Sequence, residues 1–327
     1  NHLSQTEELR PLLEVLPAGL GVSDIAYVFP FTTQTVQSTW VALRNGLRGH
    51  GAQAHLSQEY PAKLTSIEPM RDPDKFPGMT NPHILYGETW GPAIEKIMVD
   101  FGGTTPGEFT QGLVDGTRYL DFMAVGSFDS PQLFPRNDSS GKVLHLNDQI
   151  WPADLDRVAA DARPERVHFT LAVPRKEVSA RGEGKPAPVA FLIHGCQTTR
   201  FEMMQLAGYD AKFGIAVLGI DGPSHGLGLS QVESALAQGL VEEMGLKPAV
   251  QAIFSDRAVD LNGDGVKDSG VDFWTAYLFH TRDMVRQFAL DHLHLTRILE
   301  TFDGQTRWDF DVNGDGQPDL AGDFDGD

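Results

Sequence analysis

Val189-Ala190-Phe191-Leu192-Ile193-His194-Gly195 is the stretch that decides the fold, an unbroken apolar run of five residues that leads directly into a His-Gly turn. Such a run is typical of a strand that is buried on both faces in a parallel sheet. A second run, Ile215–Ile220, follows a helical pattern over Phe201–Phe213 and ends in Asp221-Gly222-Pro223-Ser224-His225-Gly226. Strand, helix and strand in succession predict an α/β layered fold.

The segments before this unit predict further strands. Val167, Phe169, Leu171 and Val173 alternate with polar residues, the period of a half-buried strand. Residues 1–160 are rich in Pro, Gly and turn dipeptides, with short β-like runs at 25–31 and 120–124 and a helical pattern at 89–101. We therefore expect an accessory domain of mixed structure over 1–160, followed by the α/β domain over 161–327.

The segments after the unit predict helices and loops. Residues 231–254 have a helical pattern and suggest a cap inserted over 227–256. A long helix is expected over Phe273–Phe302. Its apolar stripe would consist of Tyr277, Leu278, Met284, Val285, Phe288, Leu295, Ile298 and Leu299.

Composition excludes several classes of protein. The 327 residues include 26 basic and 45 acidic side chains, a net charge of −19 without a basic cluster, which argues against nucleic-acid binding. No apolar run approaches the roughly 18 residues of a membrane span, so no transmembrane segment is expected. The single cysteine, Cys196, excludes an internal disulfide. The chain begins at Asn1 without a signal peptide, which fits a mature exported protein, so we expect a secreted or cell-surface bacterial location.

Two Asp-rich loops carry a repeated pattern of oxygen ligands. The first loop (260–272) contains D-L-N-G-D-G-V-K-D, and the second (309–327) contains D-V-N-G-D-G-Q-P-D and the start of a third copy. Oxygen ligands at positions 1, 3, 5 and 9, a carbonyl at 7 and Gly at 6 suit calcium. The predicted ligands are Asp260, Asn262, Asp264, Asp268, Asp272 and the carbonyl of Val266 in the first loop, and Asp311, Asn313, Asp315, Asp319, Asp323, Asp325, Asp327 and the carbonyl of Gln317 in the second.

These loops predict two or three structural Ca²⁺ ions. Val271 and Gly322 stand where a sensor EF-hand has Glu, so the loops are not of that type. Loops of modest affinity suit the millimolar calcium outside cells. Four acidic residues lie in the first loop and seven in the second, so bound calcium would neutralise much of the negative charge.

The two turns that follow the apolar runs resemble those of the α/β-hydrolase fold. That resemblance implies an oxyanion hole at the His194-Gly195 turn, because such a hole needs backbone N–H groups fixed at a strand end. It implies the N–H of Cys196 as the first donor and that of Gln197 as the second, with His194 holding the turn. The implied activity is carboxylic-ester hydrolysis by a Ser-His-acid mechanism.

Two other nucleophiles are considered and disfavoured. Gly222-Pro223-Ser224-His225-Gly226 matches the nucleophile-elbow pattern G-x-S-x-G, but a real elbow turns directly into a helix, and Gly226 and Gly228 are a poor helix start. A complete small hydrolase that uses Ser224 is therefore a minor alternative. Cys196 would need an activating base that no His arrangement indicates.

Three further stretches narrow the resemblance. A-Y-V-F-P-F-T-T (26–33), G-S-F-D-S-P (126–131) and H-T-R-D-M-V-R-Q (280–287) are similar to those of large exported bacterial lipases and esterases with a virulence-factor-lipase N-terminal domain. In that family the elbow would follow residue 327, and the triad lies later still. The resemblance thus implies a C-terminal fragment of the same protein as a partner, and an ester or lipid as substrate.

A physical argument also predicts a missing partner. In a hydrolase sheet, Phe191, Leu192 and Ile193 would form an unpaired, apolar edge if the next strand were absent, and such edges are prone to aggregation. A cut in the exposed third copy of the Asp-rich pattern would explain a two-chain protein. The alternative from another class is a non-catalytic, calcium-stabilised surface or adhesion module.

Overall fold

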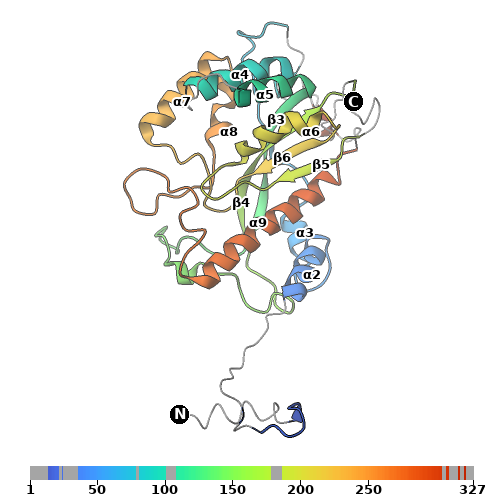
Figure 1. The fold of residues 1–327 in the computed structure, drawn as a ribbon, viewed down its shortest axis with the longest axis vertical. Coiled ribbons are helices and arrows are strands. Elements are labelled where there is room, and N and C mark those ends of the chain that lie inside the picture. The colour runs from blue at the N-terminus through green and yellow to red at the C-terminus, as the bar shows by residue number, and fades with distance from the viewer. Residues whose placement is uncertain are drawn as a thin grey trace.

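The fold is a mixed six-stranded sheet with helices on both faces (Figure 1). The computed structural model describes residues 14–21, 24, 36–78, 81–100, 108–177, 186–303, 307–308, 316 and 320–321. The six strands of this sheet are β1 (Ser66–Ile67), β2 (Ile84–Tyr86), β3 (Leu120–Gln132), β4 (Arg163–Pro174), β5 (Val189–Leu192) and β6 (Ala216–Ile220). Two further strands, β7 (Arg307–Trp308) and β8 (Leu320–Ala321), form a separate antiparallel pair.

Helices make up the outer layers of the molecule. The α-helices are α2 (Val36–Leu47), α3 (Leu56–Glu59), α4 (Gly87–Asp100), α5 (Glu108–Gly116), α6 (Met204–Ala211), α7 (Gln231–Glu243), α8 (Val250–Phe254) and α9 (Leu278–Leu299). Short 3₁₀ turns lie at Thr117–Tyr119, Leu146–Asp148, Arg200–Met203 and Lys247–Ala249. The predicted helices of the cap and of the region before β3 are therefore present as α7, α8 and α4.

The strand order is β1-β3-β4-β6-β5, and β2 also pairs with β3. β3 and β4 form a long antiparallel ladder from Leu120↔Pro174 to Gln132↔Arg163. β4 is antiparallel to β6, whereas β5 and β6 are parallel. The predicted α/β class is confirmed at this level, with a sheet that mixes antiparallel and parallel pairs.

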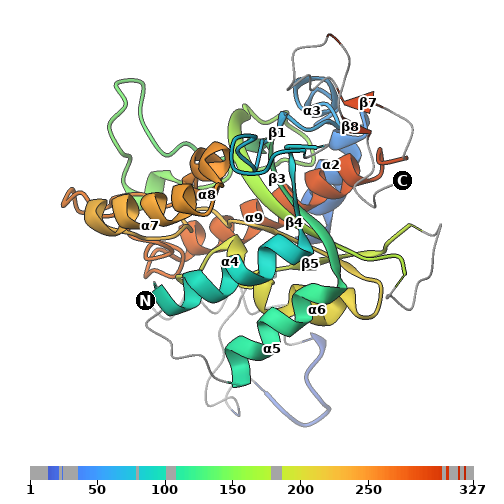
Figure 2. The ribbon, with the colours of Figure 1, turned by 90° about the horizontal axis from the view of Figure 1, so that it is seen from above.

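Helices lie on both sides of the sheet (Figure 2), and an apolar core lies between the sheet and the helices on each side. On one face, Phe169 and Leu171 of β4 pack with Phe288, Leu295 and Ile298 of α9. The other core combines side chains of α4, α6, α8 and the 3₁₀ turn before α6, among them Trp90, Ala207, Ala252 and Met203. Burial on both faces explains why β6 has no polar side chain.

The sheet crosses the domain boundary that the sequence predicts at residue 160. β1, β2 and β3 lie before this residue, and β4, β5 and β6 lie after it. On the second face, α5 also approaches α6 so closely that a Cβ on Gly208 would lie 2.6 Å from the carbonyl carbon of Gly116. Residues 66–160 and 161–303 therefore share one sheet and its cores.

β5 differs from its predicted environment because it is the edge of the sheet. Among the described strands its one neighbour is β6, and Val189 and Phe191 are not buried on both faces. Ile193, the last residue of the apolar run, is 66% exposed. The apolar pattern thus marks a strand that has only one partner among the described residues.

α9 buries only part of the apolar stripe that the pattern predicts. Met284, Phe288, Leu295 and Ile298 are buried, but Leu278 and Val285 are exposed. A polar stripe is buried in their place: Asp283 accepts from the N–H of Trp151, Gln287 donates to the carbonyl of Pro131, and Asp291 accepts from Ser130. Hydrogen bonds to β3 and to the 150s loop stabilise this polar face, which sequence periodicity cannot foresee.

Candidate functional site

The turns after β5 and β6 lie side by side and are joined by His194. Nε2 of His194 accepts a hydrogen bond from the N–H of Gly222 at 2.8 Å. Because Nε2 accepts, the ring proton lies on Nδ1, which is 2.9 Å from the carbonyl oxygen of Gly195. The His194 ring also stacks on His225, with ring centroids 4.7 Å apart. His194 therefore fixes the two turns relative to each other.

Glu202 holds the His194-Gly195 turn from the other side. Its Oε2 accepts from the N–H of Gly195 and from the hydroxyl of Thr198, both at 2.7 Å. The hydrogen bond from the Gly195 N–H is the main reason why the pKa of Glu202 lies below its usual value. The carboxylate thus remains ionised at neutral pH and binds the turn. This residue was missed by sequence reasoning, because a Glu in a 3₁₀ turn carries no pattern.

The two predicted oxyanion donors follow this turn. Gln197 has φ +61°, a left-handed conformation that is costly for a residue with a Cβ. Within the described part of the chain, the amides of Cys196 and Gln197 form no hydrogen bond. The thiol of Cys196 is exposed. The turn thus offers two neighbouring N–H groups at a strand end, the type of donor that an oxyanion requires.

The end of the first Asp-rich loop covers this turn. A Cβ on Gly270 would lie 3.0 Å from the backbone nitrogen of Gln197, so only glycine fits. The N–H of Gly270 donates to the carbonyl of Ser224 at 2.7 Å, and the hydroxyl of Ser269 bonds to both the N–H and the carbonyl of Gly226. The loop and the candidate oxyanion turn are therefore one packed unit.

Ser224 lies in a buried polar cluster. It is fully buried with φ +63°, and its Oγ accepts from Arg136 at 3.0 Å. Asp272 lies 3.6 Å from the same guanidinium and 3.8 Å from Nε2 of His280. A catalytic triad needs the base between the nucleophile and the acid. Here the acid Asp272 lies between Ser224 and His280, and no helix follows until Gln231, so the cluster does not form a nucleophile elbow.

Asp272 is a predicted calcium ligand, and its contacts with Arg136 and His280 describe the surroundings of its carboxylate. Burial raises the pKa of this carboxyl, but its interactions with His280 and Arg136 outweigh burial, and the net pKa is lowered. Its charge is thus compensated by cationic or polar side chains of the fold. This environment favours a structural role for Asp272, in contrast to the exposed residues of the same loop.

The exposed part of the first Asp-rich loop folds around its own side chains. Asp260 accepts from the N–H of Gly263 at 2.7 Å and of Gly265 at 2.9 Å. The bond from Gly265 is the main reason why the pKa of Asp260 is lowered. Asn262 and Asp264 make the same kind of turn, and Asp268 accepts from the N–H of Leu261. Gly263 and Gly265 supply the positive φ angles that the turns require.

The structure does not test the calcium prediction. No group of three or more His, Cys, Asp or Glu side chains in the described ranges is close enough to hold a metal ion. The predicted ligands Asp311, Asn313, Asp315, Gln317, Asp319, Asp323, Asp325 and Asp327 lie outside the described residues. The stretch at 26–33 also lies outside them, whereas 126–131 belongs to β3 and 280–287 to α9.

Buried arginines hold the site together. Arg200 is 1% exposed, forms an ion pair with Asp221 at the end of β6, and donates to the carbonyl of Ala252 at 2.6 Å. Arg257 is paired with Glu165 at 2.8 Å and with Asp291 of α9 at 2.6 Å. No sequence motif predicts that these arginines are buried, since their ion pairs are formed with residues that lie tens of positions away in the chain.

Comparison with known proteins gives no relative. No family model matches the chain, and neither a curated protein nor a solved structure is significantly similar to it. Among the helices that the structure describes, none has the length and apolarity needed to cross a membrane.

Proposed function

We propose that the chain is part of a carboxylic-ester hydrolase of the α/β-hydrolase type, to which it contributes the oxyanion-stabilising turn. The observation that carries the proposal is the hydrogen bond from Gly222 to His194, which joins the turns after two parallel strands. Catalytic groups commonly lie beyond the carboxyl ends of parallel strands. The strand order β3-β4-β6-β5, with β3 and β4 antiparallel, agrees with the proposed fold.

Under this proposal, the N–H groups of Cys196 and Gln197 stabilise the negative charge that develops on the substrate carbonyl oxygen. His194 and Glu202 act as positioning residues, because they bind the backbone of the turn. The nucleophile, base and acid are supplied by polypeptide beyond Asp327. The substrate is an ester or a lipid, and the location is secreted or cell-surface.

Fluorophosphonate labelling of the full-length gene product tests this proposal, because the reagent modifies activated serines. Intact-mass and peptide analysis would locate the label. A label on a serine beyond residue 327 is the expected result. A label on Ser224 would contradict the placement of the nucleophile, and the absence of any label would contradict the hydrolase.

Calcium is proposed as a structural ion of this protein. The oxygen donors of Asp260, Asn262, Asp264 and Asp268 are the chemistry that calcium prefers, and Asp260 is ionised at neutral pH. When bound, the ion would hold the exposed loop in one conformation. Because Gly270 at the end of the loop packs against Gln197, a fixed loop would also hold the candidate oxyanion turn in place.

A second candidate function is a non-catalytic, calcium-stabilised surface module. It is compatible with the arrangement of Ser224, Asp272 and His280, since this cluster offers no base next to the serine hydroxyl. This candidate predicts calcium binding without labelling of any serine in the full-length protein.

A further inference from the structure

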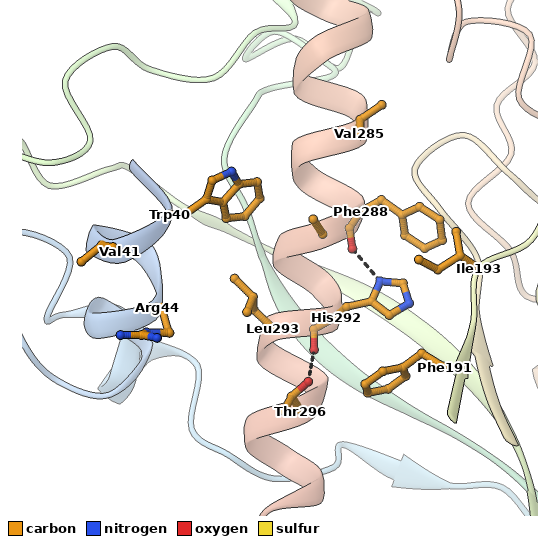
Figure 3. A pocket seen from close by; sticks show the side chains of 11 residues that line it. Trp40, Val41, Arg44, Phe191, Ile193, Val285, Phe288, His292, Leu293 and Thr296 are labelled. Carbon is orange, nitrogen blue, oxygen red and sulfur yellow. Dashed lines mark hydrogen bonds between the residues drawn. The ribbon is translucent and has the colours of Figure 1, made fainter. Parts of the chain in front are cut away.

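The chain has an apolar groove and, apart from it, a pocket that combines apolar and polar side chains. The groove lies between α2, α9 and β5, and Phe191 and Phe288 are among the side chains that line it (Figure 3). The pocket lies where the β3–β4 ladder ends, and its polar residues are Gln132, Asp161 and Arg163. We call it the ladder-end pocket. Its volume of about 400 Å³ is in the range of small-molecule sites, about 300–1,000 Å³.

The walls of the ladder-end pocket are largely apolar and are held in place by α9. They include the side chains of Leu133, Pro135, Ile150, Trp151 and Pro152. The N–H of Trp151 donates to Asp283 at 2.8 Å, and the N–H of Leu133 donates to Gln287 at 3.1 Å. Both acceptors belong to α9. A ligand therefore meets a preformed surface, which reduces the entropic cost of binding.

Gln132 brings an unsatisfied amide to this pocket. The residue is 7% exposed, and neither its Nε2 nor its Oε1 has a hydrogen-bond partner within the described part of the chain. Because Gln132 lines the pocket, rotation about the last bond of its side chain would turn the amide toward a bound molecule. Buried amides normally have partners, so the unmet donor and acceptor indicate a ligand group that both donates and accepts.

Asp161 and Arg163 bring opposite charges to the exposed side of the pocket. Both residues are exposed, and neither side chain forms an ion pair with another residue in the described ranges. The carboxylate of Asp161 only accepts hydrogen bonds, whereas the guanidinium of Arg163 only donates them. Since the two charges cancel, the pocket favours neither an anion nor a cation over a neutral molecule.

Hydroxyl groups suit all three polar side chains, because each hydroxyl both donates and accepts. A carboxylate has no proton to donate to Asp161, and an ammonium group has no lone pair to accept from Arg163. A zwitterionic amino acid matches the two charges, but exposed ion pairs contribute little, and neither of its charged ends both donates to and accepts from Gln132. A sugar ring carries several hydroxyls, and its C–H groups can pack on the apolar walls.

We propose that the ladder-end pocket binds a neutral monosaccharide or disaccharide. Gln132 donates to one hydroxyl of the sugar and accepts from a neighbouring one. Asp161 accepts from hydroxyls, Arg163 donates to them, and the ring packs on the apolar walls. None of the residues that line the pocket belongs to the candidate oxyanion turn, so binding here does not depend on the proposed ester hydrolysis.

Saturation-transfer NMR and calorimetry test this binding, with glucose, galactose, maltose and cellobiose as the neutral probes. Glucuronate, glucosamine and L-leucine are the anionic, cationic and zwitterionic probes. We expect at least one neutral sugar to bind with a Kd of about 1 mM or lower, and more tightly than every charged probe. A weaker affinity for all four neutral sugars would overturn the proposal, and so would a charged probe that binds as tightly.

A matched pair of glutamine variants locates the sugar. Gln132→Met removes the amide and keeps an unbranched side chain, so the affinity should fall at least about tenfold. Because the amide is unpaired in the protein alone, the midpoint of urea unfolding should not fall. Gln111→Met is the control, since Gln111 is exposed on α5, bonds to Asp115 and does not line the pocket. Equal affinities of the two variants would show that the sugar does not lie in the ladder-end pocket.

Two charge variants test the ligand class without disturbing a buried residue. Asp161→Asn leaves the charge of Arg163 unbalanced, so glucuronate should bind about threefold more tightly than it binds to the unmodified protein. Arg163→Gln leaves the charge of Asp161 unbalanced and should do the same for glucosamine. Unchanged affinities for the charged probes in both variants would contradict the contact of the ligand with these side chains.

Discussion

Gly270 lies so close to His225 that a Cβ on the glycine would be 2.5 Å from Nε2 of the imidazole. His225 is buried, packs on Phe273 with centroids 4.9 Å apart, and bonds to the carbonyl of Pro223 through Nδ1. The ring therefore has little room to move. Gly270 and His225 are thus in tight contact, and this contact joins the first Asp-rich loop to the turn after β6.

The contact makes Gly270 sensitive to substitution. Gly270→Ala should destabilise the protein by about 1–2 kcal/mol through its left-handed φ of +67°, and by a further 1–3 kcal/mol through overpacking against His225. Gly263→Ala is the matched control, since Gly263 has φ +78° but nothing within 4 Å of its Cβ position. Urea unfolding of both variants measures the difference. Equal losses would show that the contact with His225 carries no cost.

The buried ion pair of Arg200 and Asp221 should be essential for the fold. Arg200→Met leaves Asp221 uncompensated in the interior, and we expect a loss of about 3–5 kcal/mol. Arg166→Met removes an ion pair with Asp129 in which both side chains are largely exposed, and it should cost less than about 1 kcal/mol. Denaturant unfolding at pH 7 compares the two variants. Similar losses would contradict the argument from burial.

The free energy of unfolding should decrease as the pH is lowered, and this decrease should begin at pH values well above the pKa values of carboxyl groups. Burial, together with the charges of Arg200 and Arg166, lowers the pKa of His168 from 6.5 to about 4. Between these values the unfolded chain binds a proton that the folded chain does not, so stability decreases as the pH falls through this range. The slope is up to about 1.4 kcal/mol per pH unit for this ring. His168→Gln should flatten the decrease measured by urea unfolding between pH 7 and 5, and an unchanged slope would exclude His168 as its source.

Calcium should stabilise the protein through the first Asp-rich loop. At a free concentration of 100 times the Kd, binding to the folded state alone adds about 2.7 kcal/mol. Asp260→Asn removes a charged ligand and should weaken binding at least about tenfold in calorimetry, whereas Asp74→Asn, an exposed residue far along the chain, should not. A thermal midpoint that is unaffected by calcium or by chelator would contradict the structural ion.

The positions of the strands could be predicted from the sequence, but the buried polar network could not. The runs at 167–173, 189–193 and 215–220 correspond to β4, β5 and β6, because apolar strands follow local periodicity. Asp291 and Gln287 have helical positions that resemble a solvated face. Their burial depends on Ser130 and Pro131, more than 150 residues earlier, and no local pattern contains that information.

The candidate site was foreseen in part. His194 and the turn after it carry a motif that can be recognised in the sequence. The contacts of Glu202 and Gly270 with this turn could not be predicted, because they depend on the folded arrangement of the chain. The continuous apolar run at 189–193 also predicted the wrong environment for β5. It reports the apolar nature of a strand, but it does not report how many neighbours the strand has.

The order of strands in the sheet has a consequence for synthesis on the ribosome. β3 and β4 can form their ladder as soon as Pro174 has emerged, since they are consecutive in the chain. β5 can pair only later, because β6, the strand beside it in the described sheet, begins at Ala216, 24 residues after Leu192. During this interval a nascent apolar segment lacks its partner, which is the period in which a chaperone would bind most readily. Pausing of translation between β5 and β6 would therefore increase aggregation more than pausing between β3 and β4.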